Sequence, residues 1–250
     1  YLMKDFLAAR AQLVTFILFV WEVIFIEKFL EKGRIRYAIP LILMAWLIAN
    51  LHCAVFPFYF VLFLPYIAEY FLTTFVDLDI DLRAVSRFLK IKNKFTKKEE
   101  NKEKISKKIE NIEFAKSERK RKRDIIRANP YKITVQKNHI VLLLIAVMVL
   151  SISTGIFNPA GDGAYTYLLK TMRGNTMDSI NEHLPLTLAE NYEYAIAIVV
   201  FLLILIFTDT KIKLPDLFML TGLTILTFYS RRQESIFAII CGPILVGLIG

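Results

Sequence analysis

Polar residues that suit group transfer from a phosphate-linked substrate occur at four points in an otherwise apolar sequence. Asn50 and His52 interrupt the apolar run WLIANLHCAVFPF at 46–58. The other three points are the stretches FNPAGDGAY, DSINEHLP and YSRRQES. Carboxylates and imidazoles can accept the proton of an attacking hydroxyl group. Arginine can hold a phosphate leaving group through two parallel hydrogen bonds, so these residue types together fit such a transfer.

We expect the candidate site to combine proton-handling and substrate-binding side chains. The expected catalytic residues are Glu182, His183 and His52. The expected substrate-binding residues are Asn50, Asn158, Gly161, Asp162, Arg231 and Arg232. Simpler interpretations stay open, because Asn-Pro-Ala-Gly is typical of a turn, a histidine at a helix end often makes structural hydrogen bonds, and arginines anchor in lipid headgroups. The three histidines lack metal-ligand spacing, so no metal site is expected.

The composition favours lipid as the surroundings of these residues. Hydrophobic residues make up 56% of the 250 residues, and the mean hydropathy is +0.48. Soluble globular chains contain about 45–50% apolar residues. The sequence therefore predicts an all-α fold, a polytopic transmembrane helical bundle with about seven spans of roughly 20 residues or fewer. The predicted spans are 7–29, 37–51, 53–76, 139–157, 194–208, 214–230 and 235–250.

A strongly basic segment separates the third predicted span from the fourth. Residues 90–137 include 18 Lys or Arg and 7 Asp or Glu. Positive charge beside a span indicates the cytoplasmic side and can contact anionic lipid headgroups. We expect a membrane domain at 1–89, a basic cytoplasmic insertion at 90–138 and a second membrane domain at 139–250, within the cytoplasmic membrane. Membrane topology explains the charge, so nucleic acid is not an expected partner.

This orientation predicts that the four polar stretches share the extracytoplasmic side. The second span would run outward, which puts Asn50 and His52 at its outer end. The loop 158–193, with five acidic residues, and the arginines at 231–232 would face the same compartment. Asn50 and His52 would then lie at the membrane surface, because an unpaired polar group in hydrocarbon costs several kcal/mol.

Five stretches resemble, in their order, bacterial polytopic membrane proteins of the glycosyltransferase C superfamily, which are similar to dolichyl-phosphate-mannose protein mannosyltransferases. These stretches are RAQLVTFILFVWEVIFIEKF, IPLILMAWLIANLHCAVFPF, FNPAGDGAY, SINEHLP and SRRQESIFAII. The resemblance implies site residues at Asn50, His52, Asn158, Gly161, Glu182 and Arg231 or Arg232. The sequence departs from the family pattern at Ala11, Cys53, Ala160 and His183, where that pattern has proline, glycine, tyrosine and tryptophan. The family's catalytic acid follows its first span, which in this register would precede Tyr1, so we expect the chain to be a fragment.

We expect a membrane-embedded glycosyltransferase of the bacterial cell envelope, which moves a sugar from a polyprenyl-phosphate donor to an extracytoplasmic acceptor. No cofactor is expected; a divalent ion could neutralise the phosphate, but no ligand set demands it. A transporter or flippase for a lipid-linked or polar solute is one alternative, which requires ionisable residues at span centres. Only Glu22, Glu27 and Glu69 approach this, and all three fall near predicted span ends or interfaces. A non-catalytic scaffold that docks a cytoplasmic partner through its basic segment is another. The sequence predicts Cys53 and Cys241 as lone thiols.

Overall fold

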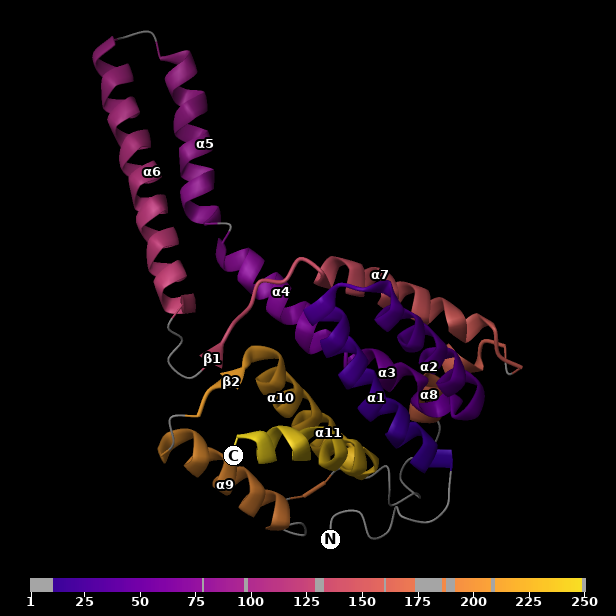
Figure 1. Ribbon diagram of the computed structural model, residues 1–250. Coiled ribbons are helices and arrows are strands. Elements are labelled where there is room, and N and C mark those ends of the chain that lie inside the picture. The colour runs from indigo at the N-terminus through magenta and orange to yellow at the C-terminus, as the bar shows by residue number, and fades with distance from the viewer. Residues whose placement is uncertain are drawn as a thin grey trace. The chain divides into compact units, whose positions relative to one another are not determined.

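Helices form nearly all of the described structure, which confirms the all-α class. The computed structural model describes residues 11–77, 79–96, 99–128, 133–159, 161–173, 186–187, 192–207 and 210–248. Within these ranges the strands are two segments of two residues each, β1 (Ile133–Thr134) and β2 (Ile212–Lys213). Figure 1 shows the order of the elements along the chain.

Most of the helices are short. The α-helices are α1 (Ala11–Lys32), α2 (Ala38–Leu51), α3 (Phe56–Val61), α4 (Leu64–Asp77), α5 (Ile80–Phe95), α6 (Glu99–Ala128), α7 (Val141–Ser153), α8 (Gly163–Arg173), α9 (Tyr192–Phe207), α10 (Leu214–Tyr229) and α11 (Glu234–Gly247). The 3-10 helices are η2 (Ile35–Tyr37), η3 (Cys53–Val55), η4 (Thr154–Ile156) and η7 (Arg231–Gln233).

Internal contacts divide the chain into two units. Unit 1 comprises Tyr1–Ala68 and Asn138–Gly250, and unit 2 comprises Glu69–Lys137. One boundary therefore falls inside α4, and the other falls shortly before α7. The segment expected as an insertion, 90–138, lies in unit 2 apart from Asn138, while unit 2 itself begins earlier.

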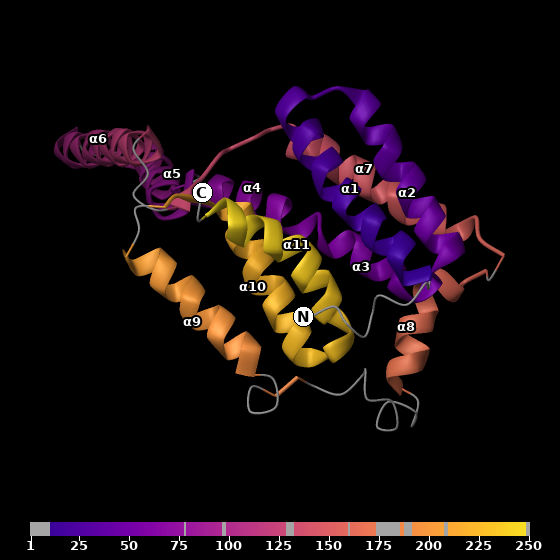
Figure 2. The same cartoon turned by 60° about the horizontal axis from the view of Figure 1, so that its bottom comes forward.

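Unit 1 contains a helical hairpin of α1 and α2. Gly33 follows α1 with a φ of +61°, a left-handed conformation that favours glycine, and its amide donates to the carbonyl of Phe29 at 2.8 Å. The Asn138 side chain donates to the carbonyl of Leu30 at 2.7 Å, which ties the segment before α7 to the same turn. Helix α2 packs against both α1 and α7, as Figures 1 and 2 show.

The core of unit 1 is apolar and aromatic. Its fully buried side chains include Phe19, Ile26, Leu41, Ile48, Phe56, Tyr59, Phe63 and Leu144. The Tyr59 hydroxyl donates to the carbonyl of Leu41 at 2.7 Å, so this buried polar group is satisfied. Cys53 and Cys241 are free thiols, in agreement with the sequence prediction.

Large apolar side chains also cover the outside of unit 1. On α7 they are Leu142, Leu143, Val149 and Leu150, each more than half exposed. On α9 they are Ile196, Val199, Val200, Leu202, Leu203 and Ile206. Soluble monomers rarely expose apolar patches larger than a few hundred Å². Helices that are apolar on all sides are typical of a protein interior or of a lipid environment.

Most of the apolar helices in the described part of the chain are shorter than a typical membrane span. Among the described residues, one helical stretch, Cys53–Asp77, is long and apolar enough to cross a membrane. Other apolar helices, such as Val141–Ile156 and Leu214–Tyr229, are shorter. At 1.5 Å per residue, a helix of 16 residues extends about 24 Å, less than the roughly 30 Å of a hydrocarbon core. Helix α1 has 22 residues, but charged residues interrupt its apolar sequence.

Unit 2 is dominated by an antiparallel pair of long helices. Helices α5 and α6 run side by side, as Figure 1 shows. Ile105 of α6 is buried, and Lys90 of α5 pairs with Glu113 of α6 at 2.9 Å on the exposed side. Most other side chains of α6 are exposed and charged, so this pair has a small apolar core.

Candidate functional site

Several helix ends of unit 1 lie toward the same end of that unit. They are the start of α1, the ends of α2 and α7, and the turn between α10 and α11, in both Figures 1 and 2. The predicted site residues that the structure describes lie at or next to these helix ends. The following contacts define the local geometry of each one.

Asn50 joins the last turn of α2 to the loop after η4. Its side-chain amide donates to the carbonyl of Trp46 at 2.8 Å and to the carbonyl of Phe157 at 3.4 Å. The Trp46 indole donates to the same Phe157 carbonyl at 3.2 Å. Two α2 side chains therefore hold one loop carbonyl, and Asn158 is the next residue of that loop.

His52 joins the end of α2 to the beginning of α1. Its Nδ1 lies 3.1 Å from the Oγ1 of Thr15, within hydrogen-bond distance. Thr15 is buried, whereas His52 is half-buried, so the imidazole has one side in the protein and one side toward the surroundings. This contact fixes one nitrogen of the imidazole ring at the end of α2.

Asn158 and Gly161 form a tight turn, as the simpler interpretation of NPAG expects. The Asn158 side-chain amide donates to the carbonyls of Gly155 at 2.6 Å and Gly161 at 3.1 Å. The Gly161 amide returns a bond to the Asn158 carbonyl, with a φ of +60° that favours glycine. Asp162 follows and is exposed; its carboxylate accepts from Thr166 at 3.2 Å and lies 3.6 Å from Lys170.

The remaining predicted residues are described only in part. Arg231 begins η7 and is half-buried, directly after α10. The side chain of Arg232, and Glu182 and His183 altogether, lie outside the described residues. The described residue Leu186 is buried, and its amide donates to the carbonyl of Phe228 at 3.2 Å. That contact joins the segment after His183 to the last turn of α10, three residues before Arg231.

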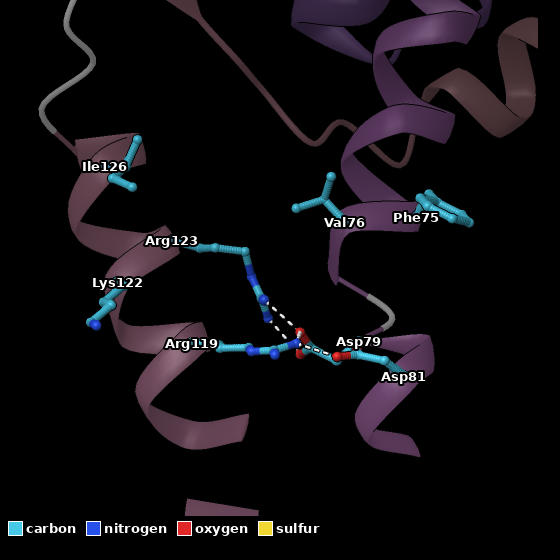
Figure 3. A pocket seen from close by; sticks show the side chains of 8 residues that line it. All are labelled: Phe75, Val76, Asp79, Asp81, Arg119, Lys122, Arg123 and Ile126. Carbon is cyan, nitrogen blue, oxygen red and sulfur yellow. Dashed lines mark hydrogen bonds and ion pairs between the residues drawn. The ribbon is translucent and has the colours of Figure 1, made fainter. Parts of the chain in front are cut away.

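Unit 2 contains a second cluster of charged side chains, a ladder of three Asp–Arg pairs. Asp79 accepts two hydrogen bonds of 2.8 Å from Arg123. Asp81 accepts one from Arg119 at 2.8 Å, and Asp77 accepts two from Arg127, at 2.9 and 3.4 Å. Figure 3 shows two of these rungs, between α6 and the start of α5. The sequence shows acids at 77, 79 and 81 and arginines at 119, 123 and 127, but their pairing depends on the register between the two segments.

Ion pairing lowers the pKa of all three carboxyl groups. The hydrogen bonds from Arg123 hold the pKa of Asp79 below its ordinary value, although its side chain is only 4% exposed. Arg119 lowers the pKa of Asp81. Burial raises the pKa of Asp77, but hydrogen bonds from Arg127 and Lys137 outweigh that effect and lower it. The three groups are therefore carboxylates at neutral pH.

A groove of about 600 Å³ opens beside this ladder. Its walls combine the charged rungs with exposed apolar side chains, as Figure 3 shows. The lining residues are Phe75, Val76, Asp79, Asp81, Arg119, Lys122, Arg123 and Ile126. A second groove of about 590 Å³ lies between the same helices and is lined almost entirely by charged residues. Because all three acids already have arginine partners, the ladder acts as a structural clamp.

A scan against protein-family models finds no match for this chain, and searches of the curated proteins and of the solved structures find none either. Within the described ranges, no group of three or more His, Cys, Asp or Glu side chains could hold a metal ion.

Proposed function

We propose that unit 1 lies in a membrane as a polytopic helical bundle. The exposed Leu, Ile and Val residues of α7 and α9 support this proposal, because lipid would cover a surface that water disfavours. The helix pair α10 and α11, which turns back at η7, also agrees with spans that cross in alternating directions. The short helices would require local thinning of the bilayer, at a modest energetic cost.

The function that this arrangement supports best is transfer of a sugar from a polyprenyl-phosphate donor to an acceptor at the extracytoplasmic surface. The observation that carries the proposal is that the ends of α2 and α7 and the turn between α10 and α11 lie toward one end of unit 1. His52, Asn158, Asp162 and Arg231 lie at or next to these helix ends in the sequence. A lipid-linked donor carries its phosphate at the membrane surface. Imidazole, carboxylate and guanidinium groups at helix ends would meet it there.

Each residue has a distinct proposed part in the reaction. Arg231 and Arg232 would bind the donor phosphate and stabilise its charge as it leaves. His52, fixed by Thr15, would orient the acceptor or the donor. Glu182 and His183 would act with it in the same reaction. Asn50 and Asn158 would position the loop that carries Asp162.

A transfer assay in native membranes tests this proposal. Membranes that contain the protein receive a pool of radiolabelled polyprenyl-phosphate sugars, and labelled acceptor is counted. We expect transfer with the wild type, and a loss of about a hundredfold in His52→Ala and Glu182→Gln at equal protein level. Transfer that is unchanged in both variants would assign these residues a structural part only.

A second candidate function, transport of a polar or lipid-linked solute, is favoured by one observation. Glu22 lies in the middle of α1 and is fully buried, and neither carboxyl oxygen has a hydrogen-bond partner among the described residues. An ionisable residue inside an apolar bundle often marks a path for ions or protons. Wild-type membranes that give no transfer from any donor, together with solute uptake that Glu22→Gln abolishes, would favour this candidate.

A further inference from the structure

Helix α5 of unit 2 has three faces of different chemistry. One face, with Leu82, Ser86, Leu89 and Asn93, is half-buried. A second face holds Arg83, Arg87, Lys90 and Lys94, at spacings of three and four residues. A third face holds Val85, Phe88, Ile91 and Phe95. Helices with a basic face and an aromatic apolar face are typical of binding at membrane surfaces.

The apolar stripe, defined as Val85, Phe88, Ile91 and Phe95, is exposed along the whole length of α5. Phe88 is 65% exposed, Ile91 is 59% exposed and Phe95 is 79% exposed. Such a continuous line of large apolar side chains is unfavourable in water, in contrast to single exposed residues. Contact with an apolar partner would therefore stabilise the stripe.

The groove beside the Asp–Arg ladder continues this apolar surface. Asp81 lines the groove and precedes Val85 by four residues and Phe88 by seven, so helical spacing places all three on one face. Phe75, Val76 and Ile126 add exposed apolar side chains to the groove. Val85, Phe88, Ile91 and Phe95 stay 49–79% exposed beside α6, so α6 leaves the stripe uncovered.

The net positive charge of α5 favours an anionic partner. The helix carries five Lys or Arg residues and a single acid, Asp81. Lys92 lies within the exposed apolar side itself, and Arg87 and Lys94 border it. A second copy of α5 would bring two basic helices together, which like-charge repulsion opposes. Anionic lipid headgroups over an apolar layer complement both the charge and the stripe.

We propose that the apolar stripe of α5 and its flanking basic residues form a docking surface for an anionic membrane surface. Helix α5 begins three residues after Asp77, the last residue of the stretch that is long enough to cross a membrane. The chain would therefore emerge from the bilayer directly before the docking helix. This inference rests on the membrane location of the proposed function and does not depend on sugar transfer.

The test places an environment-sensitive fluorophore on the stripe of the complete chain. Cys53→Ala and Cys241→Ala remove the native thiols, and Ile91→Cys supplies the labelling site. Phe114→Cys is the matched control, because Phe114 on α6 is 67% exposed. Each labelled protein is reconstituted in nanodiscs of phosphatidylcholine alone, or of phosphatidylcholine mixed with phosphatidylglycerol.

We expect emission from position 91 to shift to shorter wavelength in the anionic discs only, and to return at high salt. Emission from position 114 should not move. A Phe95→Ser substitution should reduce the shift at 91, whereas Phe114→Ser should leave it intact. Equal emission at 91 in both lipid compositions would overturn docking, as would a shift seen only in discs with two copies. A chain that fails to enter the discs would overturn the membrane location as well.

Discussion

Arg123 binds the carboxylate of Asp79 through two parallel hydrogen bonds of 2.8 Å, across 44 residues of sequence. Asp79 adopts a left-handed conformation with a φ of +43° at the start of α5. Aspartate tolerates this conformation better than most residues. The pair therefore fixes the chain where it enters the long helix pair of unit 2.

Removal of one partner of this pair should weaken the attachment of α6 to α5. Because Asp79 is nearly buried and its carboxylate accepts two charged hydrogen bonds, we expect a coupling free energy of about 2 kcal/mol between Asp79 and Arg123. A double-mutant cycle with Asp79→Asn and Arg123→Ala measures it, through amide exchange of α6. Asparagine is chosen because it tolerates the left-handed backbone conformation of position 79 as well as aspartate does.

The pair Lys90–Glu113 is the matched control for this cycle. It bridges the same two helices at 2.9 Å, but both side chains are more than half exposed. Exposed ion pairs contribute about 0.2–1 kcal/mol. Coupling between Asp79 and Arg123 that is no larger than coupling between Lys90 and Glu113 would contradict the clamp.

The ladder should make unit 2 sensitive to acid. The folded-state pKa of Asp77, Asp79 and Asp81 lies below the ordinary value of 3.8 in each case. Their contribution to stability is therefore fully present above that value, and is lost as the pH falls through the lowered pKa. Limited proteolysis of α6 should accelerate in that acid range. The acceleration should be smaller in Asp79→Asn, because that variant lacks one of the titrating carboxylates. A wild-type protein with no acceleration on acidification would refute this expectation.

The 3-10 helix η4 should not tolerate a larger residue at Gly155. A Cβ at this buried position would lie 2.7 Å from the Tyr165 hydroxyl and 2.8 Å from Phe56. Those rings pack edge to face, so neither can move freely. We expect Gly155→Ala to lower the free energy of unfolding by about 1–3 kcal/mol, which a thermal denaturation measures. Gly161→Ala tests backbone strain alone, because open space surrounds that position.

Sequence patterns predicted some features of this structure and missed others for physical reasons. Apolar runs predicted helices such as α2, α7 and α10, because the length and apolar composition of each run are enough to identify a helix. The turn at Asn158 followed from the known preferences of asparagine, proline and glycine. The Asp–Arg ladder did not follow, since its three rungs depend on the register between α6 and the start of α5. The bond from Asn50 to Phe157 joins residues 107 positions apart and likewise depends on tertiary packing.

Replacement of the buried Glu22 by an apolar residue should raise the stability of the protein. Burial of a carboxyl group without a partner is unfavourable, and an apolar residue of similar size avoids that cost. We expect Glu22→Leu to increase the free energy of unfolding by about 1 kcal/mol or more, and Glu22→Gln to change it less. Thermal denaturation in detergent compares the two variants. Marked destabilisation in both would show that Glu22 has a partner.

The most direct test of the proposed transferase compares two arginines in the polyprenyl-phosphate sugar assay. Arg231 borders the proposed phosphate site, whereas Arg121 on α6 has a side chain that is 71% exposed. The proposal predicts that Arg231→Ala lowers transfer about a hundredfold, while Arg121→Ala leaves it near the wild-type rate, at equal protein level. Equal transfer by Arg231→Ala and the wild type would contradict the proposed phosphate site.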